Sequence, residues 1–357
     1  MISIVLGTRP EIIKMSPIIR SCEKTGIPYE IIHTGQHYSY EMDQIFFEEL
    51  ELPRPNFNLD VGSGSQAEQT GKMLVGIESI LLRGGSNIVL VQGDTNTVLA
   101  GALAASKLQI PIGHVEAGLR SFDRNMPEEI NRVLTDHIST QLYAPTDQAR
   151  AYLEAEGIRE GVTVTGNTVV DAVYQNMEIS EKKKETLSEL GLTPGGYFLV
   201  TAHRQENVDV KHRLEGIMDG LSKIAEEYGL PILFPAHPRT KKMMDHFGLS
   251  IEGFKIIEPV GYLDFLQLEA KARLILSDSG GIQEEACILG VPCVTLRDNT
   301  ERPETVNVGS NILAGTDPQT ILAAAARMMK MGKDWVNPYG DGMSGQRIIK
   351  LASELSR

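Results

Sequence analysis

Residues 273–285, RLILSDSGGIQEE, decide the fold class of this chain. An apolar run over 273–277 leads through Asp278-Ser279-Gly280-Gly281 into residues with the periodicity of a helix. Consecutive apolar positions are typical of a strand buried on both faces, as in parallel sheets covered by helices. Two glycines at the start of the next helix let an anion approach free backbone N–H groups, and the serine adds a hydroxyl donor. The stretch therefore indicates an α/β fold with a candidate diphosphate site; the alternative is a plain strand–helix turn.

The same alternation of apolar runs and helical periodicity continues through all 357 residues. Strands are expected at 2–6, 29–34, 88–92, 111–115, 141–144, 162–165, 197–201, 231–234, 255–258, 273–277, 292–296 and 311–314. Helices are expected at 11–24, 66–82, 95–108, 129–139, 147–156, 211–227, 263–271, 282–289 and 318–331. This order predicts doubly wound α/β domains, and the length suggests two of them.

The polar segment 176–196 marks the expected domain boundary. We expect an N-terminal Rossmann-like domain at 1–175 and a C-terminal one at 176–343. A last helical pattern, 344–357, follows a turn-rich break and is expected to pack back on the first domain.

Composition excludes several classes of partner. The net charge is −13, and the lysines at 182–184 are the one dense basic block, so binding to nucleic acid or to an anionic membrane is disfavoured. No apolar run approaches the ~20 residues that span a bilayer, and the start lacks the basic region of a signal peptide. Three cysteines fit neither a disulfide framework nor a zinc motif, so a cytoplasmic location is expected.

Ligands of open α/β sheets bind outside the carboxyl ends of the strands, so the polar residues found there are candidates. In the first half, Arg9 and Lys14 follow the first strand and could face a phosphate or a carboxylate; a solvated turn is the alternative. Asp94 and Glu116 follow two later strands, and paired carboxylates can serve as acid and base because each raises the other's pKa. The alternatives are a helix cap for Asp94 and an ion pair with Arg120 for Glu116.

Further candidates follow the same logic. Glu128 and its neighbour Glu129 open a helix, where acids also favour the helix dipole. In the second half, His203 and Arg204 follow one strand and His237 follows the next, which suits contacts to phosphate.

Two other features of the second half extend the candidate site. Glu285 lies in the helix that starts at the two glycines, where a carboxylate can accept both hydroxyls of a ribose. The charge-rich run 297–304 follows a strand and is either a solvated face or a contact to ligand. A metal cluster of Asp94, His114, Glu116, His203 and His237 is possible in principle, but no metal-binding spacing supports it, and we predict no metal.

Taken in order, the motifs resemble those of the non-hydrolysing UDP-N-acetylglucosamine 2-epimerases. They are GTRPEIIK at 7–14, GQH at 35–37, GDT at 93–95, HVEAGLR at 114–120, PEEINR at 127–132, TGNT at 165–168, DSGGIQEE at 278–285 and RDNTERPE at 297–304. The resemblance implies a GT-B-like fold, with two Rossmann-like domains, the active site in the interdomain cleft, and a homodimer. It implies reversible conversion of UDP-GlcNAc to UDP-ManNAc without metal or other cofactor.

The resemblance also implies roles for individual residues. Ser279, Gly280 and Gly281 would contact the diphosphate, Glu285 the ribose and Phe265 the uracil, while Arg9, Lys14, His203 and Arg302 would surround the phosphates and the sugar. Asp94, Glu116 and Glu128 would be the acid–base carboxylates, with His203 beside them, and Gln36, His37, Arg204 and His237 would complete the substrate-binding set.

The expected chemistry follows from the substrate. The proton on carbon 2 is poorly acidic, but loss of UDP from carbon 1 develops a cation that acidifies it. Carboxylates can stabilise that cation and take the proton, giving a 2-acetamidoglucal to which UDP adds again. Three alternatives stay open: an epimerase for a UDP-2,3-diacetamido sugar acid, a glycosyltransferase, and a UDP-sugar sensor without catalysis.

Overall fold

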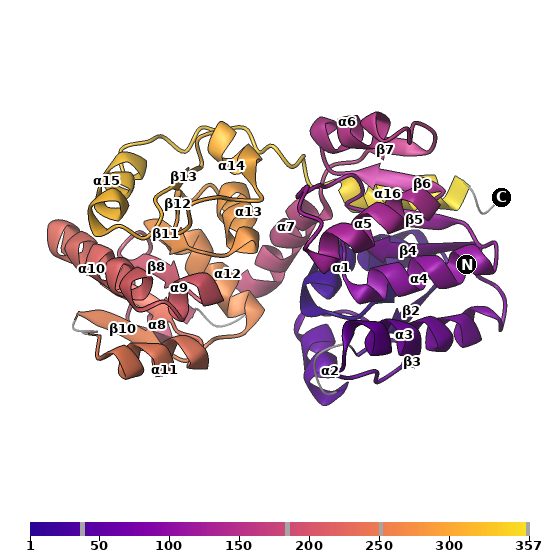
Figure 1. The fold of residues 1–357 in the computed structure, drawn as a ribbon, viewed down its shortest axis with the longest axis horizontal. Coiled ribbons are helices and arrows are strands. Elements are labelled where there is room, and N and C mark those ends of the chain that lie inside the picture. Colours follow the sequence, from indigo (N-terminus) through magenta and orange to yellow (C-terminus); the bar gives the residue numbers. More distant parts are fainter. Residues whose placement is uncertain (36–39, 183–185, 250–252, 355–357) are drawn as a thin grey trace. The chain divides into compact units, whose positions relative to one another are not determined.

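A computed structural model describes residues 1–35, 40–182, 186–249 and 253–354, and the chain divides into two compact units (Figure 1). The first unit consists of Met1–Gln175 and Tyr339–Arg357, and the second consists of Asn176–Pro338. Within the described ranges, no helix has the length and apolarity needed to cross a bilayer.

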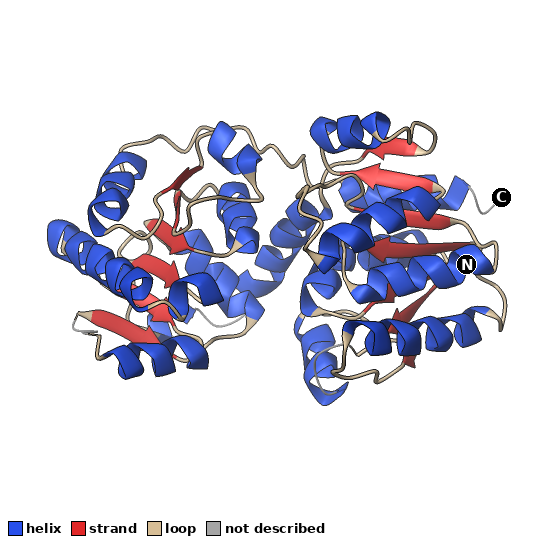
Figure 2. Cartoon of the chain, in the orientation of Figure 1, coloured by secondary structure: helices blue, strands red, loops and turns tan. Residues whose placement is uncertain are grey.

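The first unit is a seven-stranded parallel sheet flanked by helices (Figure 2). Its strand order is β3-β2-β1-β4-β5-β6-β7, with β1 Ile2–Leu6, β2 Tyr29–His33, β3 Phe57–Asn58, β4 Ile88–Gln92, β5 Ile112–Val115, β6 Gln141–Ala144 and β7 Val162–Val164. Its helices are α1 Arg9–Thr25, α2 Tyr40–Glu49, α3 Gln66–Leu81, α4 Asn96–Lys107, α5 Pro127–Ile138, α6 Asp147–Ala155, α16 Ser344–Glu354 and most of α7 Thr168–Glu181.

The second unit is a six-stranded parallel sheet in the order β10-β9-β8-β11-β12-β13. Its strands are β8 Phe198–Thr201, β9 Ile232–Pro235, β10 Phe254–Ile257, β11 Leu274–Ser277, β12 Cys293–Thr295 and β13 Asn311–Leu313. Its helices are α8 Thr186–Glu189, α9 Gln205–Val208, α10 Lys211–Tyr228, α11 Pro238–Phe247, α12 Tyr262–Lys271, α13 Gly280–Leu289, α14 Pro303–Asn307 and α15 Pro318–Met328. In both sheets the chain adds strands first on one side of the first strand and then on its other side, as in doubly wound folds.

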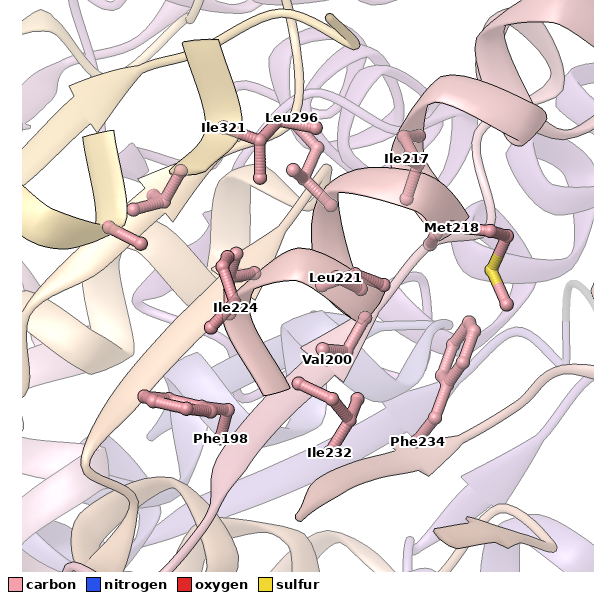
Figure 3. Close-up of a cluster of buried hydrophobic side chains, with 14 of the residues drawn as sticks. Phe198, Val200, Ile217, Met218, Leu221, Ile224, Ile232, Phe234, Leu296 and Ile321 are labelled. Atoms are coloured by element: carbon pink, nitrogen blue, oxygen red, sulfur yellow. The ribbon is translucent and has the colours of Figure 1, made fainter. Parts of the chain in front are cut away.

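Strand burial explains the consecutive apolar runs of the sequence. Along β8, Phe198 and Val200 join one buried cluster, which includes the apolar side of α10 (Figure 3). Leu199, between them, joins a second cluster. Because successive side chains of a strand point to opposite faces, both faces of this sheet are covered, and the three consecutive positions 198–200 are all apolar.

The C-terminal helix α16 belongs to the first unit, where Figure 1 shows it in yellow. Its start is bound by Asp171, whose carboxylate accepts the backbone N–H groups of Ser344 at 3.2 Å and Gly345 at 2.9 Å. Gly345 lies against α1, because a Cβ there would approach Pro17 to 3.0 Å. Glycine therefore permits the close packing of these two helices.

The polar segment 176–196, expected as the domain boundary, is partly helical in the structure. Residues 176–181 continue helix α7, and 186–189 form the short helix α8. Ser180 is buried there: its hydroxyl donates to the carbonyl of Leu263, and its own carbonyl accepts from the Gln267 amide.

Candidate active site

Glu116 is the centre of the carboxyl edge of the first sheet. Its carboxylate accepts from Lys14 Nζ at 2.7 and 3.0 Å and from Asn167 Nδ2 at 3.3 Å, and it also accepts from the Gln92 amide. These donors come from α1, from the loop after β7 and from β4. Lys14 therefore pairs with a carboxylate in this structure, one of the two roles predicted for it.

The alternative ion pair between Glu116 and Arg120 is wrong. Arg120 instead donates to Asp136 at 2.7 Å and to both oxygens of Glu156 at 2.7 Å. Glu116 also has a positive φ of 71°, a conformation that costs free energy for a residue with a side chain. This left-handed conformation turns the chain sharply at the end of β5, so that the Glu116 carboxylate lies at the sheet edge.

Asp94 follows β4, the strand beside β5, and its side chain is partly exposed. Its carboxylate accepts from Arg132, and its backbone carbonyl accepts from the Asn131 amide at 3.0 Å. The alternative role as a helix cap is wrong, because the residue at the cap of α4 is Thr95. Arg132 thus fixes Asp94 at the same edge as Glu116.

The two acids at the start of α5 differ. Glu129 is buried and accepts from the backbone N–H groups of Ser121 at 2.9 Å and Phe122 at 3.0 Å, so it holds the loop in front of the helix. Glu128 is exposed in the first turn. Only Glu128 is therefore placed to meet a ligand from solvent.

The turn after β1 is organised by Glu11, which the sequence reading did not single out as a site residue. Its buried carboxylate accepts from the N–H groups of Gly7 at 2.6 Å and Thr8 at 2.8 Å, and from the hydroxyl of Thr95 next to Asp94. Arg9 begins α1 with its guanidinium 5.4 Å from the centre of the Phe46 ring. Gln36 and His37 lie outside the described residues.

We expect Glu11 to make the first unit less stable as the pH rises. Burial raises the pKa of Glu11 from 4.5 to about 7, although its hydrogen bonds oppose the shift. The native state therefore binds more protons than the unfolded state between these values, and the free energy of unfolding falls by on the order of 1 kcal/mol per pH unit there. Urea unfolding at pH 5 and 8 should show a larger loss for the wild type than for Glu11→Gln; equal losses would refute the assignment.

In the second unit, Asp278 joins the loops that follow β8 and β11. It is fully buried and accepts from the N–H groups of His203 and Arg204, each at 3.0 Å, and from Asn207 Nδ2 at 3.2 Å. Nδ1 of His203 lies 3.1 Å from the same carboxylate. Burial alone would raise the pKa of Asp278, but these partners lower it overall. An ionised Asp278 therefore holds His203 and Arg204 beside Ser279.

The start of α13 is open. Ser279 is the residue at the cap, and its side chain does not bond to the first turn of the helix. A Cβ added to Gly280 would lie 3.8 Å from the nearest atom, of Glu301, and one added to Gly281 would lie 3.9 Å from Ser279. Neither glycine has a positive φ. Neither backbone conformation nor packing therefore requires glycine at these two positions. The absence of side chains does leave room for an anion to approach the N–H groups of the helix.

Replacing Gly280 with alanine should separate binding from folding. The methyl group meets open space and alanine favours helix over glycine, so the melting temperature should be unchanged or slightly raised. Affinity for UDP should fall about tenfold or more, because the methyl group blocks the approach to the backbone. Calorimetric titration of both proteins measures this, and an unchanged affinity would remove the diphosphate from this helix start.

The remaining predicted residues lie in different surroundings. Glu285 accepts from the hydroxyl of Tyr262 at 3.1 Å, and Arg302 pairs with the buried Glu284 at 2.7 Å. Phe265 on α12 packs against a core cluster. His237 caps α11, its Nδ1 accepting from the N–H of Arg239 at 3.2 Å, which is a structural role that the sequence did not predict.

The charge-rich run 297–304 folds back toward the loop after β8. Arg297 donates to Glu301 at 2.7 and 3.0 Å, and Arg204 lies 3.8 Å from the same carboxylate. The run is therefore bonded to candidate site residues rather than to solvent alone. In the part of the chain that the structure describes, no three His, Cys, Asp or Glu side chains form a group able to hold a metal ion.

The chain matches the family profile described as UDP-N-acetylglucosamine 2-epimerase over residues 20–353. It is 59% identical to a UDP-N-acetylglucosamine 2-epimerase of Methanocaldococcus jannaschii, over 98% of each sequence. The chain belongs to this 2-epimerase family. Membership confirms the family resemblance and makes the chain an enzyme of the isomerase type.

Structures of the 2-epimerase family confirm the GT-B-like α/β fold class. A crystal structure of the M. jannaschii UDP-GlcNAc 2-epimerase in complex with UDP-GlcNAc and UDP matches with a TM-score of 0.87 over 99% of each chain, at 59% identity. A more distant relative is the UDP-2,3-diacetamido-2,3-dideoxy-D-glucuronate 2-epimerase of Pseudomonas aeruginosa, which is 42% identical over 98% of this chain and 99% of that protein. This chain is thus more similar to the UDP-N-acetylglucosamine 2-epimerase than to the epimerase for the diacetamido sugar acid.

Proposed function

We propose that this chain interconverts UDP-GlcNAc and UDP-ManNAc by eliminating UDP and adding it again. The observation that supports it most is the open start of α13 next to the His203-Arg204 loop, which is hydrogen-bonded to Asp278. The chain is also 59% identical to a UDP-N-acetylglucosamine 2-epimerase. The proposed substrate is the UDP-sugar, and the proposed location is the cytoplasm. We also propose a homodimer, which sedimentation of the purified protein can test.

The second unit binds the nucleotide in this proposal. N–H groups of Gly280 and Gly281 and the Ser279 hydroxyl donate to the diphosphate, and His203, Arg204 and Arg302 add positive charge. Such donors stabilise the charge that develops on the leaving diphosphate as the bond from carbon 1 to oxygen breaks. Glu285 accepts from the ribose hydroxyls, and Phe265 lies against the uracil.

The first unit supplies the carboxylates that act on the sugar in this proposal. As the C1–O bond breaks, its electron pair leaves with UDP and carbon 1 gains cationic character, which the carboxylates stabilise. One of Asp94, Glu116 and Glu128 then removes the proton from carbon 2, and the C–H electrons form the C1=C2 bond of 2-acetamidoglucal. Return of a proton to the other face of carbon 2, with attack of UDP on carbon 1, gives the epimer.

Replacing Glu285 with alanine should weaken UDP binding by about tenfold or more. Hydrogen bonds to an ionised acceptor contribute about 1.5–3 kcal/mol each, and the ribose would lose its acceptor. Glu227→Ala, an exposed glutamate on α10 of the same unit, is the matched control and should leave the affinity unchanged. Calorimetry that finds equal affinities for the two variants would rule out Glu285 as the ribose partner.

The proposed substrate can be tested by comparing turnover of two UDP-sugars. Purified protein incubated with UDP-GlcNAc should produce UDP-ManNAc, resolved by chromatography. The 42% identical relative makes the UDP-2,3-diacetamido sugar acid the second candidate. Comparing kcat/KM for the two UDP-sugars should favour UDP-GlcNAc, and a preference for the acid would replace the first proposal with the second.

A further inference from the structure

A buried ion-pair network lies below the carboxylate edge of the first unit. His114 is on β5, two residues before Glu116, and its Nδ1 lies 2.6 Å from Oδ1 of Asp136 on α5. Its Nε2 lies 2.9 Å from the backbone carbonyl of Gly93, the residue before Asp94. The His114 and Asp136 side chains are 1% and 0% exposed, so this network is shielded from water.

Geometry determines the protonation of His114. A backbone carbonyl can only accept, so Nε2 carries a proton. Asp136 also accepts from Arg120 at 2.7 Å and from the N–H of Gly118 at 3.2 Å, which favours its ionised form. Nδ1 at 2.6 Å from this carboxylate must then donate as well, so that His114 is an imidazolium. The direction of its pKa agrees: burial alone would lower it, but Asp136 raises it overall.

The cation contacts the turn that leads to Asp94. Gly93 is held twice by β5, because its N–H donates to the carbonyl of Val115 at 3.1 Å while its own carbonyl accepts from His114. Gly93 has a φ of 85°, a turn that glycine adopts without strain. Glu116 follows His114 by two residues, directly after the end of β5, and its charge adds to the rise in the His114 pKa.

We propose that His114 is a positioning residue for the acid–base carboxylates: a buried cation that fixes the turn leading to Asp94 and supplies positive charge beside Glu116. A neutral amide could hold the Gly93 carbonyl without the free-energy cost of burying a charge. The positive charge of His114 is therefore not needed to hold Gly93, and its role in this proposal is to keep Glu116 ionised. Lys14 provides a second positive charge, while Gln92 and Asn167 donate neutral hydrogen bonds to Glu116. This inference depends on the proposed function.

His114→Gln is the variant that tests it, because glutamine can still donate to Gly93 but has no charge. UDP affinity should be unchanged, since the nucleotide is assigned to the second unit. We expect kcat to fall about 30-fold and the acidic limb of the pH profile of kcat to move to higher pH, because the carboxylate edge loses a nearby cation. His33→Gln is the matched control: His33 ends β2 of the same sheet, is 1% exposed, and should leave both quantities unchanged.

A purely structural role for His114 would lower kcat without moving the acidic limb, and that outcome or an unchanged kcat would overturn the proposal. A second measurement does not require the variant to fold or the enzyme to turn over. In ¹⁵N spectra of the histidine-labelled wild type at pH 8, one of the eight histidines should keep both ring nitrogens protonated. Eight neutral rings would overturn the proposal independently, whereas a protonated ring in a protein that forms no UDP-ManNAc would contradict only the proposed function.

Discussion

Glu116→Gln should lower kcat by about 10²–10⁴-fold and leave the affinity for UDP within twofold of the wild type. Glutamine has nearly the same shape but can neither take a proton nor balance the charge of Lys14, which lies 2.7 Å away. Catalysis should therefore fail, while the nucleotide site that we propose in the second unit is unaffected. Steady-state turnover of UDP-GlcNAc, with UDP binding measured by calorimetry, gives both numbers.

The matched control is Glu154→Gln, on helix α6 of the same unit. Glu154 is exposed and lies 3.8 Å from Arg150, so its removal changes charge without touching the candidate edge. If Glu116→Gln turned over at the rate of this control, Glu116 would have no part in the proton transfer, and Asp94 and Glu128 would remain as candidates.

Asp278→Asn should reduce the free energy of unfolding of the second unit by about 3 kcal/mol or more and UDP affinity by more than tenfold. The buried carboxylate accepts from two backbone N–H groups, from Asn207 and from His203, and an amide would turn a donor toward some of them. Removing one partner from a buried charged network is costly because the other groups are left without acceptors. Loss of this anchor should also free the His203-Arg204 loop.

Urea unfolding and calorimetric titration of UDP measure the two effects. Asp219→Asn, an exposed change on α10, is the control and should alter neither. A variant at Asp278 that kept wild-type stability would show that the bonds in this network contribute little, and one that lost stability but kept its UDP affinity would show that the loop is not needed for binding.

Strand positions could be read from the sequence because parallel strands covered on both faces are continuous apolar runs. All twelve predicted strands occur, within about a residue of their expected bounds. The strand β3 was missed because Phe57–Asn58 is too short to show a pattern. Six helices were missed: α2, α7, α8, α9, α11 and α14. Of these, α11 escaped because its polar sequence, Pro238–Phe247, buries only Thr240 and Met244.

The candidate site was less predictable, since its geometry depends on contacts between residues far apart in the chain. Lys14 and Glu116 are 102 positions apart, so their pairing is set by the order β1-β4-β5 and not by local pattern. Arg120 appeared well spaced for Glu116, but the sharp turn at Glu116 leaves it bonded to Asp136.

The most direct test of the central claim is the fate of the hydrogen on carbon 2. UDP-GlcNAc incubated with the protein in heavy water, and then analysed by mass spectrometry, should yield UDP-ManNAc with one deuterium, and the recovered UDP-GlcNAc should gain the same label as the reaction reverses. Deuterium at carbon 2 of both epimers would support removal and return of that proton at the carboxylate edge. Formation of UDP-ManNAc without deuterium, or binding of UDP-GlcNAc with neither epimer nor label, would contradict it.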